Sequence, residues 1–556
     1  MRFPFCLRWR PCVRAMLSAA VLSGPFTRVH ADEPVPAVSP DQVVPSEDVP
    51  EVARIATAEQ APYSGAAAPT PAATAPAPKP APPPAPWKGL YFDNDFSYKK
   101  KPDHKHLLGE ELKDMPLDFL DGLDFLDGST LSYGGEFRHR YMNEDQRLRP
   151  GGPGRSTYDL LRWRQYLDLK VQDNFRAYIE MLDASIFNQE LPITAIDQNR
   201  WNIQNAFVDL KVAERDGKPV YLRVGRQELL YGSQQVISPL DWANTRRNFE
   251  GFKLTSKGDA WDVDLFATRP VNTGSPTGPN GARPANSVLH FGSARDRADS
   301  SRWFSGLYSV YKGIENQTIE PYYVWLQTDS GFSAPTWADG NRHTTGLRWT
   351  TTTPIKDECG QPWLVLTSDV EGAYQFGNDN TKRVNAGFFT SKLGGTLSQA
   401  PWTPNLQFIY YWGSGDRNSK DGQNNTYDIL FPLNHAYWGI IDNLSGQNLN
   451  QLGIQTTVKP HAKVTCLGAM HWFSLDTNAD KLYTVTGSPL GTAGFGKNLG
   501  QELDLIATYA YNPNFDVQLG YQWFWYGSNI SHRPAGAAGV PRDDATQLYV
   551  QTSLRY

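Results

Sequence analysis

Arginine recurs at alternate positions in two nearby stretches of the chain, FRHRY and LRWRQ. Successive side chains of a β-strand point to opposite faces. Arg138 and Arg140 would therefore share one face of a strand, and Arg162 and Arg164 one face of the next. Clustered guanidinium groups bind carboxylates through paired hydrogen bonds, and in a confined channel they attract anions. The spacing therefore predicts a site that recognises an anion.

Other charged residues fall on the same polar faces of the expected strands. The cations are Arg176 and Arg223, and the acids are Asp168, Glu180, Asp262, Asp264, Asp369 and Glu371. Two interpretations remain open. The cations could form a lane that guides a polyanion, or arginines and carboxylates could pair across strands and brace the wall. Pairing is the simpler role for any single arginine, whereas the group of four favours ligand guidance.

The remaining reactive residues do not form a catalytic pattern. Four histidines stand without a serine partner or metal-ligand spacing: His139, His343, His435 and His471. No Cys/His cluster has zinc spacing. The loop around Asp416, Asn418 and Asp421 departs from the spacing of a calcium-binding loop. We therefore predict no catalytic residue, no metal and no cofactor, and keep a barrel enzyme, such as a lipase or glycan hydrolase, only as a third alternative.

The elements that must position the arginines are strands. From residue 129 to the end, segments of about 9 to 12 residues alternate apolar and polar side chains, as membrane-spanning strands do. LRWRQYLDLKV is one example, and we count about eighteen. Short turns alternate with long polar links, and the last segment is TQLYVQTSLRY. A soluble β-sandwich would not alternate its connections in this way. We therefore predict an all-β, transmembrane antiparallel barrel with apolar faces toward lipid and charges toward a water-filled lumen.

The part of the chain before the barrel divides into three. Residues 1–31 resemble a signal peptide, with a basic start, a short apolar core and a small-residue cleavage site. Residues 32–86 are expected to form a disordered Pro/Ala-rich periplasmic linker. Residues 87–128 form a pre-barrel segment with the repeat DFLDGLDFLDG. We favour an unanchored segment over a small helix that occupies the barrel mouth. Residues 129–556 form the expected barrel.

Composition limits the classes of function. The net charge of −5 and pI of about 6.1 argue against nucleic-acid binding. Mean hydropathy is −0.50, and no stretch reaches the roughly 20 apolar residues of a membrane helix. After cleavage only Cys359 and Cys466 would remain, so no disulfide scaffold is expected. The expected location is the outer membrane of a Gram-negative-type bacterium.

Three segments resemble the alginate-export family of outer-membrane barrels: YLRVGRQELLYGSQQVISPLDWANTRRNFEGFKL, FPLNHAYWGIIDN and GQELDLIATYAYNPNFDVQLGYQWFW. The resemblance implies an eighteen-stranded barrel that passes an anionic polysaccharide outward through an arginine-rich constriction. Arg226 and Arg247 match the motif and are expected in the lumen or at a loop base, where Arg226 could pair with Asp241.

The resulting functional prediction is a channel for an alginate-like anionic saccharide, by guided diffusion. The alternative is a general or anion-selective porin without polymer specificity. Expected partners are the saccharide, outer-membrane lipid, the barrel-assembly machinery and a periplasmic export partner.

Overall fold

The computed structural model describes residues 86–118, 126–149, 152–272, 296–329, 339–534 and 537–556. The predicted signal peptide, nearly all of the Pro/Ala-rich linker and most of the DFLDGLDFLDG repeat lie outside these residues. No helix in the described ranges is long and apolar enough to cross a membrane.

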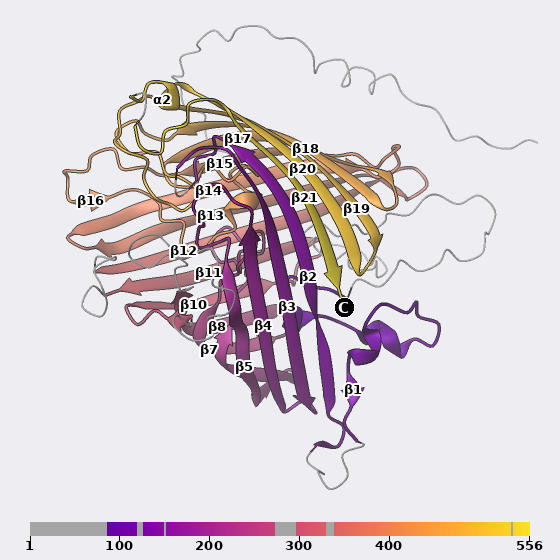
Figure 1. Ribbon diagram of the computed structural model, residues 1–556. Coiled ribbons are helices and arrows are strands. Elements are labelled where there is room, and N and C mark those ends of the chain that lie inside the picture. Colours follow the sequence, from indigo (N-terminus) through magenta and orange to yellow (C-terminus); the bar gives the residue numbers. More distant parts are fainter. Residues whose placement is uncertain (1–85, 119–125, 150–151, 273–295, 330–338, 535–536) are drawn as a thin grey trace, which may run out of the picture. The chain divides into compact units, whose positions relative to one another are not determined.

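Eighteen antiparallel strands form one closed barrel, which confirms the predicted fold class. Each strand pairs with its neighbours in the chain, and β21 pairs with β2, so the sheet has no free edge (Figure 1). The barrel strands are β2 (Thr130–Asp145), β3 (Ser156–Val171), β4 (Phe175–Phe187), β5 (Asn199–Arg215), β6 (Lys218–Gln227), β7 (Phe249–Lys257), β8 (Trp261–Asn272), β10 (Arg302–Tyr311), β11 (Gln317–Thr328), β12 (Gly340–Lys356), β13 (Pro362–Asp379), β14 (Lys382–Leu397), β15 (Asn405–Gly413), β17 (Leu449–His461), β18 (Val464–Leu475), β19 (Asn498–Asn512), β20 (Phe515–Tyr526) and β21 (Ala545–Arg555).

Short elements accompany the barrel strands. They are β1 (Met115–Pro116), β9 (Arg297–Ala298), β16 (Gln423–Asn424), the 3-10 helices η1 (Tyr91–Asp93), η2 (Ser97–Lys100), η3 (Glu110–Leu112) and η5 (Asn434–Ala436), and the α-helix α2 (Ser528–Ser531). Of these, η1, η2, η3 and β1 precede the barrel in the chain.

The two faces of each strand differ as the alternation predicts. On β3, Trp163 and Leu167 are 38% and 46% exposed, whereas Arg162 and Arg164 are each 1% exposed. An outer face this apolar suits lipid, and the charged faces point into the barrel.

The two ends of the barrel carry different connections. At one end, here called the turn end, strands are joined by short links such as 172–174 and 462–463. The opposite end, here called the loop end, carries long links, although β13 and β14 are joined there by 380–381 alone. Short periplasmic turns and long extracellular loops are typical of outer-membrane barrels.

Two of the long links fold inward instead of extending away from the barrel. They are the β6–β7 loop (228–248) and the β15–β17 loop (414–448). Phe431 of the second loop packs edge-on against the inward-facing Phe249 and Phe304, with ring centroids 5.1 and 4.8 Å apart. The loop-end half of the interior therefore holds an apolar core, which differs from the uniformly water-filled lumen expected from the strand pattern. Apolar inward residues on the wall supply the surface on which the loops fold.

Residues 86–113 are here called the inserted segment, because their first part, around η1, enters the barrel. Tyr91 and Phe92 of η1 are each 4% exposed, and they pack against Tyr166, Tyr178 and Phe207 on the inner faces of β3, β4 and β5. This part of the pre-barrel segment is thus anchored, whereas the choice between an unanchored segment and a small helix for the DFLDGLDFLDG repeat falls mostly on residues outside the described ranges. The inserted segment and the barrel wall both present aromatic side chains at this contact. Burying their apolar surface stabilises the contact by roughly 25 cal/mol per Å².

Candidate functional site: an arginine wall inside the barrel

The structure brings the four alternating arginines together on the inner faces of β2 and β3. Arg138 and Arg162 are direct cross-strand partners. Arg140 and Arg164 lie two residues further along their strands, in opposite directions. All four side chains are at most 3% exposed. We call this group the arginine wall.

Backbone carbonyls of the β6–β7 loop hold the centre of the arginine wall. The carbonyl oxygen of Asp241 accepts hydrogen bonds from Arg138 and from Arg162, each at 2.9 Å. The carbonyl of Ala243 also accepts from both, at 2.7 and 3.2 Å. Arg162 is further bound by the carboxylates of Glu136, 2.8 Å from its Nε, and of Asp241, 2.9 Å from its Nη2. Two like charges can lie side by side here because the oxygens between them are shared.

Arg140 is held by neutral groups. Its Nε and Nη2 donate to Oε1 of Gln551 at 2.9 and 2.7 Å. Its guanidinium lies 3.5 Å from the ring centroid of Trp242, which stacks in turn on His435. Within the described part of the chain, neither Arg138 nor Arg140 forms an ion pair. Their direct contacts are backbone carbonyls, a side-chain amide and an aromatic face.

Arg164 is covered by the inserted segment. Its Nε donates to Glu180 at 2.6 Å, and its guanidinium lies 3.9 Å from the ring centroid of Tyr91. The hydroxyl of Tyr91 donates to Glu136 at 2.7 Å. Burial and the Glu136 carboxylate raise the pKa of Tyr91 above its ordinary value, so the hydroxyl keeps its proton and donates.

Two further arginines extend the cationic surface as paired ladders. Arg176 binds Asp168 with two hydrogen bonds, at 2.7 and 2.8 Å, and Arg223 binds Asp209 in the same way. Phe92 lies over this region. Its carbonyl accepts from Arg176 at 2.6 Å, and its ring centroid is 4.4 Å from the guanidinium of Arg223. Pairing thus describes these two arginines, while the arginine wall also contains unpaired charge.

Arg226 does not join the arginine wall. On β5, Phe207 and Asp209 face the interior, and their cross-strand partners on β6 are Gly225 and Arg223. Arg226 therefore points to the outer face. It donates to the backbone carbonyls of Ile203 and Asp296 at 3.1 and 3.0 Å. Its expected place in the lumen was wrong, and its position fits the loop-base alternative.

Arg247 joins the two inward loops. Its Nη1 donates to the carbonyl of Phe431 at 2.6 Å and to that of Ser238 at 3.0 Å. Burial lowers the pKa of Arg247 to about 10, so the side chain stays charged at neutral pH. Its contacts are those of a loop anchor.

The remaining predicted acids lie on other parts of the interior. Asp262 binds Lys312 at 2.8 Å, and Asp264 accepts from the hydroxyl of Tyr231 at 2.9 Å. On β13, Asp369 binds Arg348 through two hydrogen bonds of 2.8 Å, and Glu371 accepts from Tyr322 at 3.0 Å and from Ser233. None of these four carboxylates contacts the arginine wall in the described structure.

Sequence reasoning missed Arg246, which joins the β6–β7 loop to the inserted segment. Its guanidinium binds Glu228 and Asp241, and its Nη2 donates to the carbonyl of Gly89 at 3.1 Å. Burial and the nearby Arg164 lower the pKa of Arg246 below its ordinary value. The adjacent Arg-Arg pair in the family-like segment was the available signal. Asp241, expected to pair with Arg226, instead pairs with Arg162 and Arg246.

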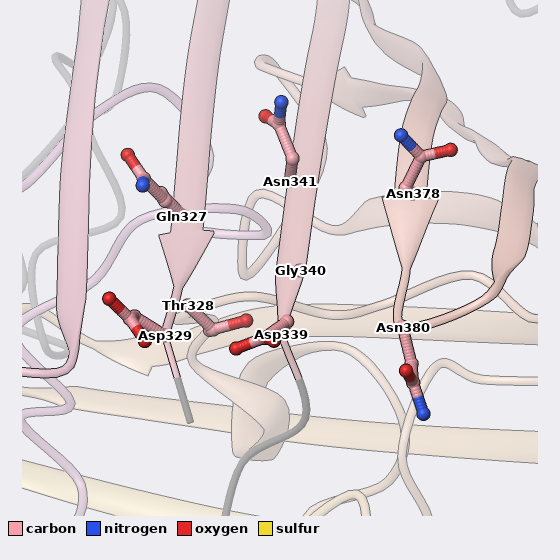
Figure 2. A pocket seen from close by; sticks show the side chains of 8 residues that line it. All are labelled: Gln327, Thr328, Asp329, Asp339, Gly340, Asn341, Asn378 and Asn380. Carbon is pink, nitrogen blue, oxygen red and sulfur yellow. The ribbon is translucent and has the colours of Figure 1, made fainter. Parts of the chain in front are cut away.

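A separate polar hollow of about 400 Å³ opens at the loop end of the barrel, where β11 and β13 end and β12 begins (Figure 2). Amide and carboxylate side chains line it: Gln327, Thr328, Asp329, Asp339, Asn341, Asn378 and Asn380, together with Gly340. It contains no arginine and lies apart from the arginine wall in the sheet order.

Comparisons with known proteins give one family. Residues 129–539 match the family model described as alginate export. Similar solved structures are outer-membrane proteins of Pseudomonas aeruginosa. OprD is 11% identical, with 77% of this chain and 93% of that chain covered and a TM-score of 0.48. OccD3 (OpdP) is 12% identical, with 85% and 99% covered and a TM-score of 0.47. No match is found among curated protein sequences.

Proposed function

The chain belongs to the alginate-export family, and on that premise we propose that this outer-membrane channel passes an anionic, alginate-like polysaccharide or oligosaccharide. The polymer moves by guided diffusion along the arginine wall. Its carboxylates exchange from one guanidinium to the next, because bidentate pairing is strong and each site lies beside another.

The observation that carries this proposal is that Arg138 and Arg140 are buried and bound by uncharged groups. Both are buried cations without a carboxylate partner among the residues that the structure describes. The carbonyls of Asp241 and Ala243 bind Arg138, and Gln551 binds Arg140. A uronate carboxylate offers the same oxygen acceptors with a negative charge, and charge-assisted hydrogen bonds are roughly twice as strong as neutral ones. Such a ligand can therefore compete with the protein's own oxygens.

In this structure the arginine wall is covered from both ends. The β6–β7 loop covers Arg138 and Arg162, and the inserted segment covers Arg164. The two meet where Arg246 donates to the carbonyl of Gly89. We infer that this arrangement is the closed channel and that the inserted segment is a plug, which must leave its place before a polymer can pass. Insertion by the barrel-assembly machinery and a periplasmic export partner belong to the same proposal.

Single-channel recording tests the proposal. The full chain is placed in a planar bilayer, and reversal potential under a salt gradient is measured during openings, before and after oligouronates are added. We expect anion selectivity and block by the oligomers. Both should weaken in the Arg138→Gln/Arg140→Gln variant, which removes the two unpaired charges.

A matched control removes a lumen arginine without changing net charge. Arg348→Gln/Asp369→Asn eliminates the Arg348–Asp369 ion pair, and with it the contact of Arg348 with Glu320, on β12 and β13, away from the arginine wall. It should leave selectivity and block unchanged. If the Arg138/Arg140 variant retains wild-type selectivity and block, the arginine wall does not guide the ligand. An open pore that ignores oligouronates would identify a general porin.

A further inference from the structure

Three side chains with metal-binding atoms converge in the inserted segment. His104, His106 and Glu110 each offer one ligand atom, and these atoms all lie within 4.8 Å of one another. Nε2 of His104 lies 2.9 Å from Oε1 of Glu110, and Nδ1 of His106 contacts the same oxygen. Two imidazoles thus face one carboxylate oxygen. We call this group the histidine site.

The contacts of His104 fix the orientation of its ring and direct Nε2 toward Glu110. Nδ1 of His104 lies 2.7 Å from the carbonyl oxygen of Lys101, which can only accept a hydrogen bond. A neutral imidazole has one N–H, and the carbonyl requires it at Nδ1. Nε2 then points toward the Glu110 carboxylate, 2.9 Å from Oε1. A metal ion bound here would take the place of the proton that Nε2 shares with Oε1, and the carbonyl would orient the ligand, as partners behind metal-binding histidines do.

The two carboxylate oxygens of Glu110 have different contacts. Oε2 accepts hydrogen bonds from the backbone N–H of Leu107 at 2.9 Å and the hydroxyl of Tyr98 at 3.1 Å. Oε1 faces the two imidazoles. The Glu110 side chain is 7% exposed, whereas that of His106 is 84% exposed. One side of the site is therefore fixed by protein, and the other is open to water.

We propose that His104, His106 and Glu110 bind a divalent late first-row transition-metal ion, with Zn²⁺ as the probe. Two histidines and one carboxylate with an open position form a common Zn²⁺ ligand set. The neighbouring Lys99, Lys101 and Lys105 oppose a cation electrostatically. Lys99, however, directs its ammonium to the backbone carbonyls of Glu110 and Lys113 and not to the carboxylate.

The histidine site lies next to the barrel wall at the turn end. Within its 104–110 stretch, the N–H of Leu108 donates to Asn514 at 3.3 Å, and the carbonyl of Leu108 accepts from the same amide at 3.1 Å. Gly109 has φ of 75° and lies against the backbone of Tyr556, where a Cβ would come 2.9 Å from the carbonyl carbon. A metal ion would thus cross-link a stretch that is already attached to the barrel.

Metal binding to the full-length protein in detergent tests the proposal. The protein is stripped with a chelator, titrated with Zn²⁺ by calorimetry, and its bound metal is counted after gel filtration. We expect one high-affinity equivalent per chain. In His104→Gln/His106→Gln, affinity should fall by at least about tenfold, since both nitrogen ligands are lost. His461→Gln, a change at another exposed histidine, should bind as the wild type does.

Two controls keep the result decisive. Migration of the unheated barrel in SDS gels shows whether each variant is folded. Co²⁺ supplies a second readout, since its visible absorption bands report nitrogen and oxygen ligation and should disappear in the double variant. Absence of binding by the wild type, or equal binding by the wild type and a folded double variant, would overturn the proposal.

Discussion

Replacement of Tyr91 by phenylalanine should open the channel more often. The change keeps the ring beneath Arg164 but removes the 2.7 Å hydrogen bond from the hydroxyl to the Glu136 carboxylate. A hydrogen bond to a charged group contributes about 1.5–3 kcal/mol. Since 1.4 kcal/mol corresponds to a factor of ten, the ratio of docked to undocked inserted segment should fall about 10- to 100-fold. Tyr91→Ala, which also loses the buried ring, should open the channel still more often.

The assay is the frequency of openings in a planar bilayer, recorded at fixed voltage and salt. Tyr374→Phe is the matched control. Its hydroxyl donates to Asn385 at 3.1 Å, and the side chain is 49% exposed on the outer face. This control should behave as the wild type does. If Tyr91→Phe also opens no more often than the wild type, contacts of the inserted segment with the arginine wall do not keep the channel closed.

Three other changes probe the interior. Trp242→Ala removes the aromatic face over Arg140, and with it a cation–π interaction of about 1–2 kcal/mol. Oligouronates should then block open channels at about 5- to 30-fold lower concentration. Unchanged block would mean that Trp242 does not mask the cation. Gly439→Ala adds a Cβ against the Glu502 carboxylate at a residue with φ of 94°. It should lower the free energy of unfolding by about 1–3 kcal/mol, measured as a lower unfolding temperature of the barrel in SDS gels. An unchanged temperature would show that the β15–β17 loop can shift. Chelation of a zinc-loaded protein should raise opening frequency because the inserted segment loses a cross-link, and a variant without the histidine site should not respond.

The barrel and its faces were predictable because the strand period is local. Side chains two apart share a face whatever surrounds them, so the inward positions of Arg138 and Arg162 follow from spacing alone. The same rule places Arg223 and Arg226, three residues apart, on opposite faces. The motif favoured Arg226 as a lumen residue, whereas the strand period places it on the outer face. The structure has Arg226 on the outer face, as the strand period predicts.

The contents of the barrel were not predictable in this way. Tyr91 meets Glu136 through a fold in which residues far apart in the chain come together, and no periodicity encodes this contact. The inward course of the β6–β7 loop has the same origin, because its carbonyls bind arginines about 80 to 100 residues earlier. The histidine site was not predicted because two histidines at i and i+2 do not by themselves have zinc spacing, and the third ligand is a carboxylate, Glu110.

The attachment of the inserted segment near Tyr556 has a consequence for the order of assembly. Leu108 binds Asn514, 406 positions further along the chain, and Gly109 rests on Tyr556, whose N–H and carbonyl pair with Gly135 as β21 meets β2. The surface that receives Leu108 and Gly109 exists only after the seam between these strands has closed. Non-local contacts form late because the long intervening chain must first be ordered. Docking of this stretch is therefore a late folding event, and a barrel with a defective seam would lack the surface that holds the inserted segment.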